Sequence, residues 1–200
     1  SFPLGRVARV ALAVLVTAPA ASAGLLWNEQ LNGDFSDHHL TPTPLVLSPG
    51  QSEINGRIED GGGGAHLDLD YFSLPIPAGH RLESMVLLTY LSPDAAAFLA
   101  MQPGPVFPQS PDDITGGDQL MGWVHFGPSY LGLDLLPFMA ANGSGFTPPL
   151  PAGVFSFWAQ QTDDLTEYTL LLDVQPIPSP AAGFAGLCLA IALSNRRQSR

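Results

Sequence analysis

The stretch "GVFSFWAQQTDDLTEYTLLLDV", residues 153–174, contains the clearest alternation of apolar and polar side chains in the sequence. In its second half, apolar residues occupy every other position: Tyr168, Leu170, Leu172 and Val174. In its first half, the same alternation places on one face Phe155, Phe157 and Ala159. Successive side chains of a strand point to opposite faces, so each half predicts a strand with one buried face.

Similar short segments recur through the chain, separated by glycine, proline, asparagine and aspartate. The predicted strands are residues 44–47, 52–57, 69–76, 82–91, 96–101, 122–126, 153–160 and 167–174. Two long loops interrupt them, residues 103–119 and 136–153, with one helical turn expected near residues 135–140. This spacing of strands and turn signals predicts an all-β fold, a single antiparallel β-sandwich. We expect it to occupy residues 24–176 as one domain.

The N-terminal segment has the pattern of a secretory signal peptide, residues 1–23. Arg6 and Arg9 form its charged part, and residues 10–16 form a short apolar run expected to be helical. Cleavage by signal peptidase is predicted after the A-x-A motif of Ala21 and Ala23, so that Gly24 begins the mature chain.

The charge of the body argues against anionic partners. Residues 24–176 hold all eighteen acidic residues but only Arg57 and Arg81 as basic ones, which gives a formal charge of −16. Nucleic acids and anionic membrane surfaces attract cationic patches, so neither is an expected partner. Such an acidic body favours solubility and, where carboxylates converge, divalent cations.

The motifs in the first half of the body, together with the closing strands, resemble the bacterial pre-peptidase C-terminal domain. The resemblance covers residues 54–101 and 151–174, through D-x-D-Y-F at residues 68–72, P-A-G at residues 77–79 and 151–153, and Y-x-L at residues 168–170. It implies a small jelly-roll-like sandwich of the kind attached to secreted hydrolases and surface proteins. We expect no enzymatic domain beside it in this sequence.

The C-terminal segment, residues 177–200, combines a proline motif, an apolar run and an arginine cluster. The motif is Ile177, Pro178, Ser179 and Pro180, and the cluster includes Arg196 and Arg197. The apolar run at residues 181–193 is expected to be helical, and at about 1.5 Å per residue it reaches about two-thirds of a bilayer core of roughly 30 Å.

This tail resembles the PEP-CTERM sorting signals of Gram-negative bacteria, with Ser179 in the place where glutamate is commonest. The resemblance implies recognition and cleavage by a membrane-embedded exosortase during export. The membrane contact would be transient, and the destination would be the cell surface or extracellular matrix.

Three aspartates, Asp68, Asp70 and Asp94, form a candidate calcium site at one edge of the sandwich. The body has no cysteine, since Cys188 lies in the tail, so calcium is a candidate stabiliser of a domain without disulfides. The alternative, which the sequence alone favours, is that Asp68 and Asp70 cap a turn and face water. A second acidic group in a glycine-rich loop, Asp112, Asp113 and Asp118, is interpreted as solvated charge.

Other constellations favour structural interpretations. His38 and His39 lie beside Asp34 and Asp37, but zinc needs three or four ligands in fixed geometry, and we interpret this segment as exposed. No spacing of serine, histidine and aspartate indicates a catalytic triad, so no enzyme is predicted. Five aromatic residues could form a platform on which sugar rings stack: Trp27, Trp123, Trp158, Tyr130 and Phe126. The favoured alternative is that these residues pack in the core.

The sequence therefore predicts a non-catalytic exported protein that serves structurally in the exopolysaccharide matrix or the envelope. The alternative is a calcium-dependent module that binds carbohydrate, such as extracellular polysaccharide, or protein. A cryptic hydrolase is the third hypothesis.

Overall fold

The computed structural model describes residues 23–59, 68–161 and 165–178. Most of the predicted signal peptide, including Ala21, and most of the sorting tail lie outside the described residues. The tail residues outside them include Ser179, Pro180, Arg196 and Arg197. Within the described ranges, no helix has the length and apolar character needed to cross a bilayer.

The described chain is built mainly of strands. In order they are β1 (Gly24–Asn28), β2 (Thr43–Pro44), β3 (Gly50–Ile58), β4 (Leu69–Ile76), β5 (His80–Leu91), β6 (Ala97–Pro103), β7 (Gly122–Phe126), β8 (Gly153–Gln160) and β9 (Thr166–Pro176). The helices are short: α1 (Glu29–Asn32), α2 (Leu136–Ala141) and the 3-10 turns η1 (Pro111–Asp113), η2 (Gly117–Gln119) and η3 (Pro128–Tyr130). Each predicted strand segment contains a strand or part of one, and α2 lies where one helical turn was expected.

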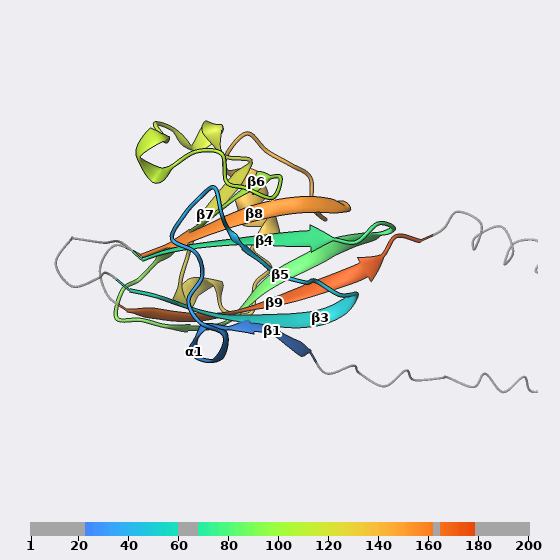
Figure 1. Cartoon of the computed structure of the whole chain (residues 1–200), viewed down its shortest axis with the longest axis horizontal. Coiled ribbons are helices and arrows are strands. Elements are labelled where there is room, and N and C mark those ends of the chain that lie inside the picture. The colour runs from blue at the N-terminus through green and yellow to red at the C-terminus, as the bar shows by residue number, and fades with distance from the viewer. Residues whose placement is uncertain (1–22, 60–67, 162–164, 179–200) are drawn as a thin grey trace, which may run out of the picture.

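The strands form two facing sheets, with the orders β1-β3-β9-β5 and β2-β4-β8-β6-β7 (Figure 1). The prediction of an all-β fold is confirmed, but the sheets are mixed rather than wholly antiparallel. β1 runs parallel to β3, and β2 runs parallel to β4. In both cases a long connection separates the paired strands, which is what a parallel pair requires. β1 itself was not predicted.

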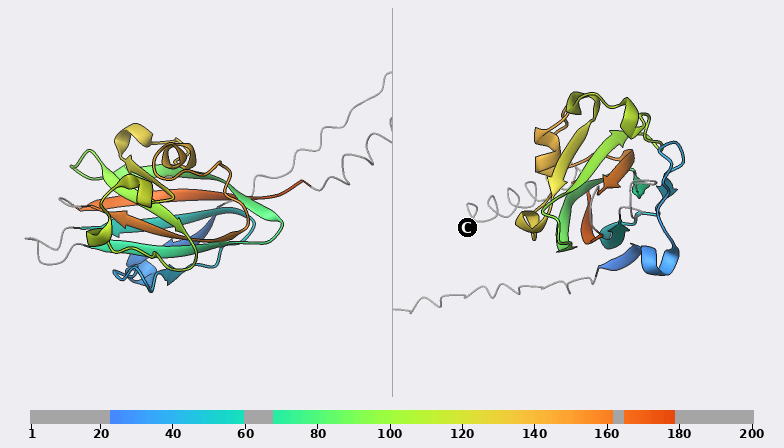
Figure 2. Two further views of the ribbon diagram at one scale, coloured as in Figure 1. Left: turned by 90° about the horizontal axis from the view of Figure 1, so that it is seen from above. Right: turned by 90° about the vertical axis from the view of Figure 1, so that its left-hand side faces the viewer.

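The core lies between the two sheets and follows the period-2 pattern of the sequence. The alternating apolar residues of β8 and β9 face inward and join one buried cluster, as predicted. Phe72 of β4 stacks on Phe157 of β8, its partner in register, with ring centroids 5.3 Å apart. Figure 2 shows the two layers from above and end on.

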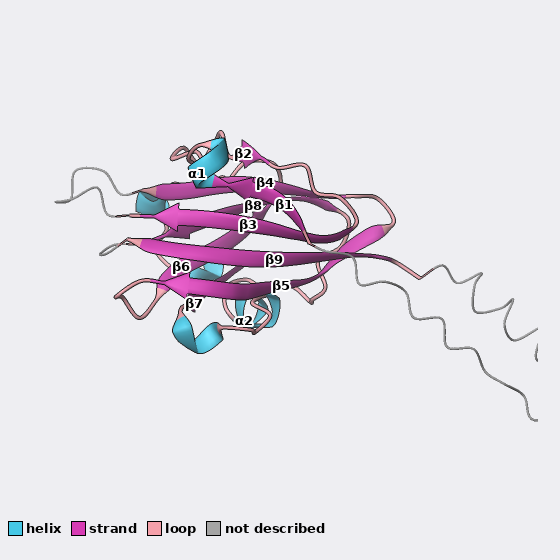
Figure 3. Ribbon diagram, turned by 90° about the horizontal axis from the view of Figure 1, so that it is seen from below, coloured by secondary structure: helices cyan, strands magenta, loops and turns pink. Residues whose placement is uncertain are grey.

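The two ends of the sandwich differ. β1 begins and β9 finishes at the same end, because Gly24 pairs with Ser52 and Gly50 pairs with Val174. The opposite end carries α1 and the start of β4, and we call it the acidic end (Figure 3). Ile177 remains tied to the sandwich, because its N–H donates to the carbonyl of Gly79 at 2.8 Å.

Candidate cation site

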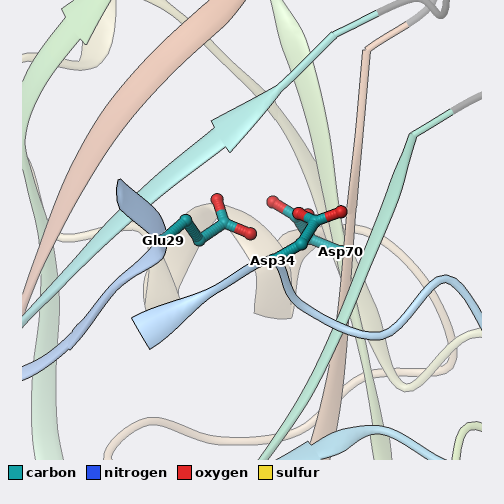
Figure 4. Close-up of side chains that lie close together, drawn as sticks. All are labelled: Glu29, Asp34 and Asp70. Carbon is teal, nitrogen blue, oxygen red and sulfur yellow. The ribbon is translucent and has the colours of Figure 1, made fainter. Parts of the chain in front are cut away.

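Five carboxyl groups converge at the acidic end. The carboxylate oxygens of Glu29, Asp34 and Asp70 lie within 4.8 Å of one another, and Asp34 forms a second such group with Asp37 and Asp68. Figure 4 shows the first group, in which the three carboxyl groups point toward one another from separate segments. Because Asp34 belongs to both groups, we treat the five residues as one acidic cluster.

Local turn chemistry places the first two members. Asn28 caps α1 by accepting a hydrogen bond from the N–H of Gln30, which fixes the direction of Glu29 at the first helical position. Gly33 ends the turn with φ of 91°, a conformation that favours glycine. Phe35, only 3% exposed, then packs between Trp27 and Phe72 and so anchors the neighbouring Asp34.

Backbone hydrogen bonds hold three of the carboxylates in place. Glu29 accepts from the N–H groups of Phe35, at 2.7 Å, and of Arg57. Asp68 accepts from the N–H of Glu59 at 3.0 Å. Asp37 accepts from the N–H of Leu69, the first residue of β4, at 3.2 Å. The cluster is therefore held by backbone N–H groups at the end of β3 and the start of β4, together with that of Phe35.

Asp70 is the buried member of the cluster, with no exposed surface. Its Oδ2 accepts a hydrogen bond at 3.0 Å from the hydroxyl of Tyr168, which reaches across from the other sheet. Its Oδ1 is also buried and has no hydrogen-bond partner among the described residues. A buried oxygen without a partner is costly, and a bound cation would satisfy it.

Gly56 makes the reach of Tyr168 possible. The two residues face each other in register on β3 and β9. A Cβ on Gly56 would lie 2.1 Å from the aromatic ring of Tyr168, far inside van der Waals contact. The absence of a side chain at this position therefore lets the Tyr168 ring cross β3 and place its hydroxyl against Asp70.

The electrostatics of the cluster disfavour ionised carboxylates without a counter-ion. Burial raises the pKa of Glu29 to about 8 and the pKa of Asp68 to about 6. Burial, then repulsion from Glu29 and Asp68, raises the pKa of Asp70 well above its ordinary value. The nearby Arg57 pairs instead with Glu59, at 3.1 Å.

This donor set fits calcium. Calcium binds six to eight oxygens at about 2.3–2.6 Å, so oxygens on opposite sides of the ion lie about 5 Å apart. The clustered oxygens are spaced within that range, and the cluster contains no cysteine or histidine, the ligands that zinc favours. A pocket of about 260 Å³, lined in part by Glu29, Asp34 and Asp68, opens the cluster to solvent.

The structure brings together two of the three predicted calcium ligands. Asp68 and Asp70 belong to the cluster, and Asp70 is buried rather than a solvent-facing turn cap. Asp94 belongs to neither of the acidic groups found among the described residues. It lies between β5 and β6, where its Oδ1 accepts from the N–H of Ala95 at 2.6 Å.

Sequence reasoning did not place Glu29, Asp34 and Asp37 in a candidate cation site. In the sequence, Asp34 and Asp37 were weighed only as part of a zinc site with His38 and His39. The ring nitrogen Nδ1 of His39 lies 2.8 Å from the carbonyl oxygen of Phe107, and neither histidine is in the acidic groups. The only signal in the sequence is the recurrence of acidic residues in segments 29–37 and 59–70.

Comparison of the chain with protein-family models, curated proteins and solved structures finds no match. The resemblances to the pre-peptidase C-terminal domain and to PEP-CTERM sorting signals therefore stay predictions.

Proposed function

We propose that this chain is a non-catalytic, exported β-sandwich that binds a calcium ion at its acidic end and is stabilised by it. The observation that carries the proposal is the cluster of five carboxylates joined through Asp34, in which Oδ1 of Asp70 is buried without a hydrogen-bond partner among the described residues. The proposal places the protein outside the cell, where millimolar calcium is available to sites of modest affinity.

Export and sorting rest on the sequence. The signal peptide of residues 1–23 and the tail of residues 177–200 support secretion and processing by an exosortase, with the cell surface or extracellular matrix as destination. A structural role there is consistent with a compact domain that needs no disulfide. The jelly-roll-like topology implied by the resemblance belongs to the same proposal.

A thermal melt of the purified protein tests calcium binding most directly. Melts are compared in millimolar calcium, in the same concentration of magnesium, and in EDTA. An ion bound only by the folded state stabilises it by about 2.7 kcal/mol at one hundred times its dissociation constant. For a domain of this size, that raises Tm by about 5–10 °C.

Magnesium separates a calcium site from general screening of negative charge. Magnesium requires a tight octahedral shell and keeps several waters, so we expect it to raise Tm less than calcium does. Coincident melts in calcium and EDTA would sink the proposal. Equal shifts in calcium and magnesium would reduce it to screening of the acidic surface.

A further inference from the structure

A groove lined by aromatic rings lies on the outer face of the β2-β4-β8-β6-β7 sheet. It consists of two hollows of about 290 and 280 Å³, which share Phe98 and His125 as a common wall. Trp158 and Gln160 line the first hollow, and Trp123 lines the second. Two contiguous hollows of this kind fit a chain-like ligand better than a single small molecule.

The strand alternation explains why these rings face outward. On β6, the neighbours of Phe98 point into the core, so Phe98 points away from it, and the same holds for Trp123 on β7 and Trp158 on β8. The ring of Phe98 lies 4.9 Å from that of Trp158 and 6.0 Å from that of Trp123, between centroids. Phe98 is therefore the centre of the aromatic surface.

Packing from behind holds the aromatic groove in place. Trp158 stacks on Tyr71 with centroids 6.1 Å apart and meets the edge of Phe107 at 5.8 Å. The backbone N–H of Phe107 in turn donates a hydrogen bond to the carbonyl oxygen of His39, at 2.8 Å. Trp158 thus belongs to a second buried cluster outside the main core, and Phe98 and Trp123 pack against that cluster while staying partly exposed.

We propose that this groove binds a neutral polysaccharide. Sugar rings present C–H groups that pack on the faces of Phe98 and Trp123, and hydroxyls that pair with polar side chains at the edge. Gln160 and His125 supply such polar groups, opposite Phe98 in register on both sides. The inference goes beyond the proposed function, since it rests on residues outside the acidic cluster.

Charge and polarity argue against other occupants. The body carries a formal charge of −16, which repels anionic polymers. A purely apolar partner would bury the imidazole of His125 and the amide of Gln160 without hydrogen-bond partners, which costs free energy. A hydroxyl-rich, uncharged chain meets both requirements.

Affinity electrophoresis of the purified protein tests the proposal, with calcium in every gel. The gels contain laminarin, hydroxyethyl cellulose, galactomannan or xylan, and anionic alginate serves as a charge control. We expect retardation by at least one neutral polysaccharide and none by alginate. Phe98→Ala should weaken retention about tenfold, as expected for the loss of an aromatic contact.

Two further variants keep the test decisive if Phe98→Ala folds poorly. His125 is exposed, so His125→Ala should leave Tm unchanged and still weaken retention. Phe138→Ala removes an exposed ring on α2, outside the groove, and should bind as the unmodified protein does. Unchanged mobility in all neutral gels overturns the proposal, as does equal retention of Phe98→Ala and His125→Ala with the unmodified protein. Retention by phenyl-agarose alone also overturns it, in favour of an apolar partner.

Discussion

Two acidic regions of this molecule behave differently. The acidic cluster gathers Glu29 and four aspartates from segments distant in sequence, and it buries Asp70 completely. The acidic loop, with Asp112, Asp113 and Asp118 on η1 and η2, leaves all three carboxylates exposed. The acidic cluster arises from tertiary structure, whereas the acidic loop is a local run of charge.

The difference indicates that a candidate cation site depends on the convergence and burial of carboxylates rather than on a high local density of acidic residues. In the acidic loop, Asp113 accepts a hydrogen bond from the hydroxyl of Ser110 three residues away, at 3.0 Å. Among the described residues, the carboxylates of the acidic loop belong to neither of the two groups of converging ligand atoms. Water satisfies exposed carboxylates cheaply, while a buried oxygen such as Asp70 Oδ1 needs a partner.

The largest effect is expected from Gly56→Ala. The new Cβ would collide with the Tyr168 ring, which cannot move without losing its hydrogen bond to Asp70. Overpacking and the lost hydrogen bond together should lower the free energy of unfolding by about 4 kcal/mol. Urea denaturation of the variant and of the unmodified protein measures this loss of unfolding free energy.

Gly116→Ala is the matched control in the acidic loop. There the new Cβ would meet only the carboxylate end of Asp118, at 2.7 Å, which can swing away. Its loss should stay within about 0.5 kcal/mol, as for an ordinary surface substitution. Equal losses for the two glycine variants would contradict the account of Tyr168 packing.

Asp70→Asn should have the next largest effect, on calcium binding. The amide keeps the shape of the side chain but removes the buried charge that would face the ion. We expect calcium affinity to fall about 100-fold, equivalent to about 2.8 kcal/mol, by isothermal titration calorimetry. Asp113→Asn, the same change in the acidic loop, should bind calcium normally. If both variants bind alike, the ion does not lie in the acidic cluster.

The smallest effect concerns pH. Carboxyl groups with raised pKa keep protons in the folded state that the unfolded chain has released, so calcium-free stability falls as pH rises. The fall should extend from about pH 4, the unfolded value, through about 6 for Asp68 and about 8 for Glu29. In EDTA, Tm should drop by a few degrees between pH 5 and pH 8.

Calcium binds the ionised carboxylates, so its stabilising effect should grow over the same pH window. Asp68→Asn should flatten the calcium-free slope, whereas Asp113→Asn should not. A Tm in EDTA that rises from pH 5 to pH 8 would show that the acidic cluster does not control the pH dependence.

The bounds of three strands were predictable from sequence. β4, β7 and β8 have the predicted bounds, because their alternating aromatic and aliphatic residues end at glycine, proline or polar residues. β2 is shorter than predicted, and β1 gave no alternating signal, since Leu25 remains 54% exposed. Neither β1 nor β2 has a buried residue, so the hydrophobic pattern describes these two strands poorly.

The candidate cation site was only half predictable, because its assembly depends on sheet order. The parallel addition of β1 to β3 brings Glu29 to the N–H of Arg57, a contact that no local pattern reveals. The packing of Phe35 between Trp27 and Phe72 then places Asp34. Asp94 was grouped with Asp68 and Asp70 by residue type, but its carboxylate caps its own turn.

β1 begins and β9 finishes at the same end of the sandwich, so the two flanking segments join the domain opposite the acidic end. The eleven residues of β9 run about 35 Å from the acidic end to the point where the chain leaves the sandwich. At the acidic end, adjacent strands place in one row Leu69, Gln160, Phe98 and His125, so the groove and the candidate cation site are neighbours. A molecule held by either flank, on a membrane or in a matrix, would therefore present both sites outward, at the full length of the strands from its attachment.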